Sequence, residues 1–184
     1  MLIVAITGMP GAGKSTVAEA LEAHGLKRIV MGDVIRQETK RRGLAPDEKN
    51  TGRVMLELRE KYGPGAVAEV CLKSLESVRD RAVVIDGIRS LAEVDVFRRA
   101  GRVLLVGVVA SRDRRYALLT ARGRSDVPSS RAGFDERDAR ELSIGVGNSI
   151  ALSDEVLVNE NVDAEHLGNT AVDLVNRWLD MLGE

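Results

Sequence analysis

Residues 8 to 15 are the part of the chain whose residue types and spacing most clearly indicate chemistry. They read Gly8-Met9-Pro10-Gly11-Ala12-Gly13-Lys14-Ser15, the G-x-x-x-x-G-K-S spacing of loops that cradle phosphates. Glycines let backbone N–H groups turn inward, and a helix that begins at the loop adds the positive end of its dipole. Lys14 would reach the β- and γ-phosphates of ATP, Ser15 would hold Mg²⁺, and Thr16 would donate to the α-phosphate. The alternative is a glycine-rich turn without a ligand.

Asp86 is the candidate for a second metal-binding group. A P-loop enzyme needs an acidic side chain near its metal, usually at the end of a strand. Asp86 follows the apolar run Val83-Val84-Ile85, which predicts a buried strand. We therefore expect Asp86 in the Mg²⁺ shell, through water. The alternative is an Asp that caps a helix or forms a turn.

Two further segments carry an arginine directly after a predicted strand. They read Met31-Gly32-Asp33-Val34-Ile35-Arg36 and Asp86-Gly87-Ile88-Arg89. The first resembles the T-G-D-x-L-R segment of adenylate kinases and the acidic strand-end segment of dephospho-coenzyme A kinases. The second resembles the adenylate kinase D-G-F-P-R segment. The resemblance implies that Arg36 and Arg89 grip the phosphate of an acceptor, in a site that includes Gly32, Asp33, Asp86 and Gly87.

The residues alone leave other readings of these segments open. Arg36 is also compatible with a solvated helix face, and Arg89 with a surface loop. Met31 stands where the family has Thr or Ser, and the Pro of the second segment is absent. These departures leave the identity of the acceptor open.

Arginines are concentrated between residues 112 and 140, where lysine is absent. They are Arg112, Arg114, Arg115, Arg122, Arg124, Arg131, Arg137 and Arg140. By the same resemblance, residues 122–137 form a lid, with Arg124, Arg137 and Arg140 on the transferring phosphoryl group and Arg122 near the ATP base. We expect Arg112, Arg114 and Arg115 to form surface pairs with neighbours such as Asp113. A generic arginine-rich surface is the alternative.

Strand and helix patterns alternate along the whole chain. Strands are predicted at 2–6, 27–31, 82–85, 103–109 and 156–158, with helices at 14–22, 33–42, 50–62, 65–78, 90–99, 112–122, 135–152 and 167–182 and a loop at 123–133. This alternation predicts an α/β fold around a parallel sheet. The resemblance implies a P-loop NTPase three-layer sandwich with a five-stranded parallel sheet. We expect a single domain, residues 1–184, with an acceptor flap at 33–78 and the lid at 122–137.

Composition excludes several classes of function. The 184 residues include 27 basic and 28 acidic side chains, a balance that argues against coating nucleic acid or an anionic membrane. Cys71 is the single cysteine, so neither a disulfide framework nor a cysteine metal site is expected, and its apolar neighbours predict a place in the core. With no apolar stretch of 18 residues and no basic leader, a cytoplasmic protein is expected.

From Leu2 to about Asn161 the chain resembles archaeal P-loop kinases related to adenylate kinase and dephospho-coenzyme A kinase. The resemblance implies a Mg²⁺-dependent enzyme that moves the γ-phosphoryl of ATP to a nucleoside monophosphate or similar acceptor, with Lys14, Asp33, Arg89, Arg124 and Arg137 as catalytic residues. One alternative is transfer to a hydroxyl, with Asp33 as general base. The other is an ATP-hydrolysing switch that acts on a protein or RNA partner.

Overall fold

Five parallel strands form one sheet in the computed structural model, which describes residues 1–75, 78, 80–121 and 130–183. The strands are β1 (Leu2–Thr7), β2 (Lys27–Val30), β3 (Ala82–Ile88), β4 (Arg102–Val109) and β5 (Glu155–Val158). The described helices are α1 (Lys14–Ala23), α2 (Met31–Arg41), α3 (Glu48–Tyr62), α4 (Ala66–Leu75), α5 (Leu91–Arg98), α6 (Arg112–Ala121), α7 (Arg131–Ile144), α8 (Val146–Ala151) and α9 (Ala164–Met181). The sheet order is β2-β3-β1-β4-β5.

The central strand β1 determines where a ligand can bind. It pairs with β3 on one side and β4 on the other, so that Ile6 lies opposite Asp86 and Val106. The chain therefore changes direction across the sheet at β1. In open parallel sheets, ligands bind beyond the carboxyl ends of the strands at such a point. The glycine-rich loop follows β1 directly.

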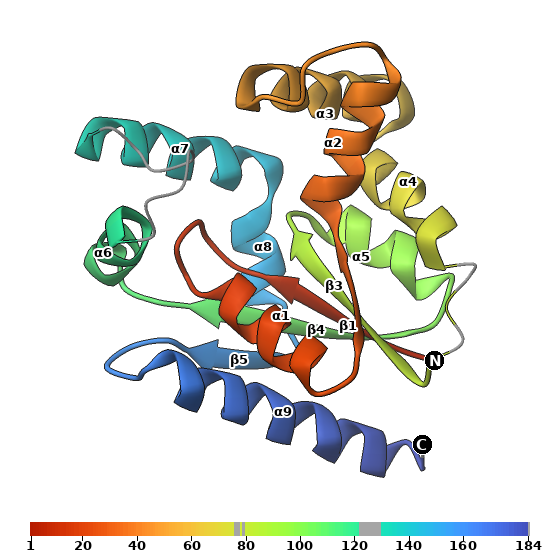
Figure 1. Cartoon of the computed structure of the whole chain (residues 1–184), viewed down its shortest axis with the longest axis vertical. Helices are drawn as coiled ribbons and strands as arrows, with labels where there is room; N and C mark the ends of the chain where they lie inside the picture. Colours follow the sequence, from red (N-terminus) through yellow and green to blue (C-terminus); the bar gives the residue numbers. More distant parts are fainter. Residues whose placement is uncertain (76–77, 79, 122–129, 184) are drawn as a thin grey trace.

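Helices cover both faces of the sheet and give three layers (Figure 1). On one face, α1 and α9 pack against side chains such as Val4 and Val84. On the other, helices α2 to α5 pack against side chains such as Ile3 and Val83. The inner strands are buried on both faces, which explains their continuous apolar sequence. Cys71 lies in this core as predicted, and burial raises the pKa of its thiol to about 12.

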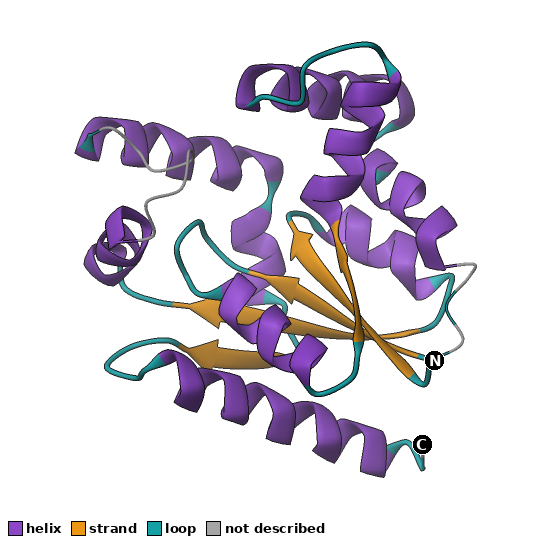
Figure 2. Ribbon diagram, viewed as in Figure 1, coloured by secondary structure: helices purple, strands orange, loops and turns teal. Residues whose placement is uncertain are grey.

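The secondary-structure predictions fail at three places (Figure 2). Met31 begins α2 instead of ending β2. The helix predicted at 135–152 is two helices, because Gly145 adopts a φ of 116° and ends α7 before α8 begins. Helix α7 also begins inside the predicted loop at 123–133, where the Ser130 side chain accepts a hydrogen bond from the Gly133 N–H.

No helix within the described part of the chain is both long and apolar enough to span a bilayer.

Candidate functional site

The glycine-rich loop packs closely against α6 and against the residue that follows β5. Gly11 and Gly13 have φ values of 81° and 108°, which other residues rarely adopt. A Cβ atom on Gly11 would lie 2.6 Å from the carbonyl oxygen of Arg115, and one on Gly13 would lie 2.5 Å from Nδ2 of Asn159. Asn159, which follows β5, also donates a 3.0 Å hydrogen bond to the carbonyl of Ala12. The loop conformation is therefore built into the fold.

The backbone N–H groups in the first turn of α1 are candidates to bind a ligand of the loop. Its N-cap residue, Gly13, provides no side-chain hydrogen bond, and the first turn contains no acidic residue. The amides at a helix start have no partner within the helix, and the helix dipole makes this end positive. Ser15 and Thr16 lie in this turn. The arrangement suits a bound anion.

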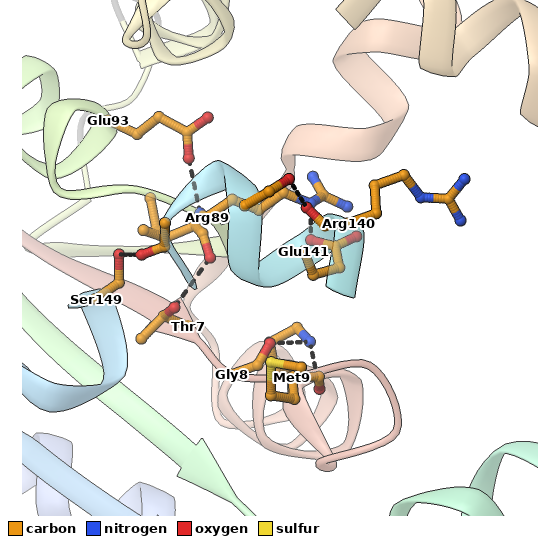
Figure 3. A network of polar contacts seen from close by, with 12 residues as sticks. Thr7, Gly8, Met9, Arg89, Glu93, Arg140, Glu141 and Ser149 are labelled. Atoms are coloured by element: carbon orange, nitrogen blue, oxygen red, sulfur yellow. Dashed lines mark hydrogen bonds and ion pairs between the residues drawn. The ribbon is translucent and has the colours of Figure 1, made fainter. Parts of the chain in front are cut away.

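Lys14 points back over the loop. Its Nζ donates hydrogen bonds of 2.7 Å and 3.1 Å to the carbonyl oxygens of Gly8 and Met9 (Figure 3). Burial, and after it the positive charge of Arg89, lower the pKa of Lys14 to about 8. Glu141 and Asp86 raise this pKa in part, and Arg137 lowers it. These charges therefore lie close enough to Lys14 to influence its protonation.

Three predicted site residues, Asp86, Arg89 and Arg137, thus lie within electrostatic range of Lys14. Arg89 donates from Nε to Glu141 at 2.9 Å, which joins the end of β3 to α7 (Figure 3). The backbone N–H of Arg89 donates to Glu93 at 2.7 Å, and the Glu93 side chain is fully buried. Arg89 is therefore fixed at both its main chain and its side chain.

Asp86 lies at the carboxyl end of β3, as predicted, and carries a partner that the sequence did not indicate. Arg28 on β2 donates to its carboxylate at 2.6 Å, and the two side chains are only 13% and 7% exposed. Arg28 also lies 3.6 Å and 3.5 Å from Glu19 and Glu22. A group of three or more metal-binding side chains is absent from the described residues. A Mg²⁺ ion here would therefore depend on Ser15, Asp86, water and the phosphates of its nucleotide, which fits the way Mg²⁺ usually binds.

Asp33 and Arg36 pair with each other on α2. The Arg36 Nε donates to Asp33 at 2.9 Å, and both side chains are about half exposed. Asp33 also lines a cavity of about 390 Å³ together with Arg28 and Gln37. Gly32 begins the same helix, and Gly87 adopts a φ of 108° at the end of β3. The pair lies on the predicted flap.

The expectation for Arg115 was wrong. Instead of forming a surface pair, Arg115 is 6% exposed and donates to the carbonyl of Pro10 at 3.1 Å. Its other bonds, at 2.8 Å and 2.6 Å, go to the carboxylate of Asp138 on α7. The planar guanidinium can bridge both partners because it presents several fixed donors. Arg115 therefore ties the phosphate loop to α7.

The other arginines between residues 112 and 131 have different partners. Arg112 forms an exposed pair with Asp135. Asp113, the neighbour expected to pair with the arginines of α6, pairs with Arg131. The surface pair expected for Arg114 was wrong as well, because Arg114 donates to the carbonyl of Val162 at 2.9 Å. The predicted contacts of Arg122 and Arg124 fall outside the described residues.

Sequence reasoning missed the residues that support the site: Arg28, Arg59, Glu93, Arg115, Asp138 and Glu141. Each acts across more than 20 residues of sequence. A charged residue on a helix usually indicates a solvated face, so no local pattern distinguishes these. Asn159 also supports the loop, through its hydrogen bond to the carbonyl of Ala12.

The chain is similar to proteins of archaea along most of its length. A family described as "AAA domain" matches residues 7–129. A UPF0200 protein of Methanocaldococcus jannaschii is 45% identical over 87% of this chain and 82% of its own. A UPF0200 protein of Aeropyrum pernix is 47% identical over 86% of this chain and 84% of its own.

Solved structures share the fold. A crystal structure of a Thermus thermophilus protein has a TM-score of 0.71 and 21% identity, and covers 97% of both chains. The shikimate kinase from Acinetobacter baumannii in complex with shikimate has a TM-score of 0.60 and 17% identity, and covers 96% of this chain and 93% of its own. At these identities the likeness concerns the fold alone.

Proposed function

This chain belongs to the UPF0200 family, and we propose that it transfers the γ-phosphoryl group of ATP to a small nucleotide-like acceptor. The observation that carries the proposal is the meeting of two cationic centres. Lys14, on the loop that suits a polyphosphate, lies in the electrostatic field of Arg89, which directly follows β3. By the resemblance, Arg89 would pair with the phosphate of an acceptor while Lys14 binds the phosphates of ATP.

The donor half of the proposed site is the loop itself. Main-chain amides from Gly11 to Ser15 would surround the β-phosphate, and Lys14 would turn from its carbonyl partners to phosphate oxygens. Ser15 and Asp86 would hold Mg²⁺, which neutralises charge on the phosphates. Arg122 is proposed near the base and Arg124 and Arg137 near the transferred group. Little covalent chemistry is then required of the protein, since phosphoryl transfer is mainly positioning and charge stabilisation.

The transfer itself makes one bond and breaks one. An acceptor oxygen bonds to the γ-phosphorus as the bond to the β,γ-bridging oxygen breaks and ADP leaves. A monophosphate acceptor is already ionised near neutral pH, because its second pKa is about 6. A hydroxyl acceptor must lose a proton, and Asp33 is the carboxylate proposed to take it.

A transfer assay tests the proposal. Purified protein is incubated with Mg²⁺, γ-labelled ATP and separate acceptors: AMP, CMP, GMP, UMP, dephospho-coenzyme A and shikimate. We expect label in one acceptor, and loss of that transfer in Lys14→Met. The matched control is Lys27→Met, at an exposed position on the edge strand β2, which should transfer normally. Labelled phosphate released without any labelled acceptor, and faster with a cell extract, would favour the nucleotide switch instead.

The pH profile of Asp33→Asn separates the two kinds of acceptor. For a monophosphate acceptor the substitution lowers the rate and leaves the shape of the profile unchanged. For a hydroxyl acceptor it removes the fall in rate at acidic pH, because no base remains to be protonated, and lowers the rate by about 10²–10⁴-fold.

A further inference from the structure

Arg28 on β2 forms a bridge between β3 and α1, two elements that pack together (Figure 1). Its Nη2 donates to Oδ2 of Asp86 at 2.6 Å, and its Nη1 lies 3.6 Å and 3.5 Å from carboxylate oxygens of Glu19 and Glu22. Because Val30 is the residue opposite Asp86 in the sheet, the Arg28 side chain extends forward along β2 to reach it. The two ends of one planar guanidinium therefore contact two different elements.

The two glutamates lie on the side of α1 that also carries Ser15. Glu19 follows Ser15 by four residues, and Glu22 follows Glu19 by three, so that all three positions share one face of the helix. Arg28 thus contacts the α1 face to which the proposed metal-binding hydroxyl belongs. It also contacts the other proposed metal-binding group, the carboxylate of Asp86. One side chain therefore connects the two protein groups proposed to hold Mg²⁺.

The stability of the fold is a poor explanation for this ion pair. The side chains of Arg28 and Asp86 are little exposed, and Nε of Arg28 is buried without a hydrogen-bond partner among the described residues. Moving two charges and a donor out of water costs free energy that an ion pair often does not recover. Carboxylates that hold a metal, in contrast, are themselves oriented by hydrogen bonds. Asp86 is close enough to Lys14 to oppose the lowering of its pKa by burial and Arg89, so the oriented carboxylate lies near the phosphate loop.

We propose that Arg28 is a positioning residue of the metal site, which fixes the Asp86 carboxylate relative to the Ser15 hydroxyl. The inference rests on the proposed function, in which Ser15 and Asp86 hold the Mg²⁺ that accompanies ATP. In this role Arg28 contacts neither the nucleotide nor the ion. Without its bond to Arg28, the Asp86 carboxylate could turn away from the ion. The affinity for the metal should then fall by about 10–100-fold, as it does when other supports of metal ligands are removed.

Calorimetry with a non-hydrolysable ATP analogue separates metal binding from nucleotide binding. The analogue is titrated into each protein in excess Mg²⁺ and again in excess EDTA, and the ratio of the two affinities measures how much the metal contributes. In Arg28→Met this ratio should be about tenfold or more below that of the wild type, whereas the affinity in EDTA should be unchanged. The matched control, Arg102→Met at an exposed position on β4, should keep the wild-type ratio.

A conservative substitution separates position from charge and decides alone if Arg28→Met does not fold. Arg28→Lys leaves Asp86 beside a positive charge and should fold, but one ammonium cannot hold both ends of the bridge as a planar guanidinium does. We expect it to lower the ratio several-fold. A wild-type ratio in Arg28→Lys, a higher ratio in Arg28→Met, or an equal loss of affinity in Mg²⁺ and in EDTA would overturn the proposal.

The wild type distinguishes this inference from the proposed function. If Mg²⁺ does not change the affinity of the wild type for the analogue, the metal site and the positioning role of Arg28 are both wrong, whereas binding at the phosphate loop stands. If the analogue binds in neither condition, the proposed function itself fails.

Discussion

Protonation of Lys14 gives the most quantitative prediction of the proposed site. In the ligand-free protein, burial and Arg89 lower the pKa of Lys14 from 10.5 to about 8. At one pKa unit per 1.36 kcal/mol, the ligand-free site disfavours the ammonium by about 3 kcal/mol. Phosphates bind the ammonium form, so nucleotide binding should raise this pKa again. Nucleotide binding above pH 8 should therefore take up protons.

The affinity for Mg·ATP follows from the protonated fraction. At pH 9 only about a tenth of Lys14 is protonated, so the apparent affinity should be about tenfold lower than at pH 7. In Lys14→Arg the guanidinium stays charged throughout this range, and the affinity should be independent of pH. Calorimetry in buffers of different ionisation enthalpy counts the protons, and we expect about half a proton per site near pH 8.

The pKa itself can be read by NMR. The chain has six lysines, so the Nζ signals of ¹⁵N-lysine-labelled protein can be assigned by substitution. We expect one lysine to titrate near 8 and to move above 10 with Mg·ATP. Glu141→Gln should lower the Lys14 pKa further, because Glu141 raises it, whereas Glu136→Gln, exposed on the same helix, should leave it unchanged. A Lys14 pKa above 10 in the ligand-free protein would refute the reasoning.

The same shift has a consequence for stability. The folded-state pKa of Lys14 lies below its unfolded value, so the unfolded state binds more protons between pH 8 and 10.5. The buried ammonium therefore lowers stability below pH 8. The free energy of unfolding should rise across this window, by up to about 3 kcal/mol relative to Lys14→Met.

Two further predictions concern the supports of the loop. Gly13→Ala should abolish nucleotide binding, because at a φ of 108° the added Cβ would lie 2.5 Å from Asn159. The control Gly25→Ala, at a φ of 99° with open space around it, should cost about 1 kcal/mol in stability and leave binding intact. Calorimetry and thermal unfolding measure the two effects, and equal nucleotide binding by both variants would contradict a loop conformation fixed by its packing. Arg115→Met should destabilise the protein by about 3–5 kcal/mol and slow turnover, since it leaves the carboxylate of Asp138 without its partner. Arg112→Met, which removes one side of an exposed pair, should change stability little. Chemical denaturation and steady-state rates measure both effects, and a similar loss of stability in the two variants would exclude a special role for Arg115.

Local signals in the sequence predicted the phosphate loop and the five strands. The glycine spacing before Lys14 is a local requirement of the backbone, and the apolar runs of β1, β3 and β4 reflect burial on both faces. The alternation of strands and helices predicted a parallel sheet, the resemblance implied five strands, and the structure confirms both. Gly145 was visible in the sequence, but whether a glycine ends a helix depends on a φ value that only packing determines.

The supporting charges could not be predicted in this way. Arg115 lies on α6, as Arg112 and Arg114 do. Of the three, only Arg115 donates both to the carbonyl of Pro10 and to Asp138 on α7. Ser90 and Glu93 have the spacing of a capping box. The Ser90 side chain does accept from the N–H of Glu93, but the Glu93 carboxylate accepts from Arg59 and from the N–H of Arg89. Such roles arise only when distant segments meet in the fold.

The most direct test of the central claim is a crystal structure with Mg²⁺ and a non-hydrolysable ATP analogue. We expect the triphosphate to lie within the main-chain amides of residues 11–15, with Mg²⁺ on the Ser15 hydroxyl. The Lys14 ammonium should have left the carbonyls of Gly8 and Met9 for phosphate oxygens. A nucleotide bound elsewhere, or a Lys14 that still donates to those carbonyls beside a bound triphosphate, would contradict the account.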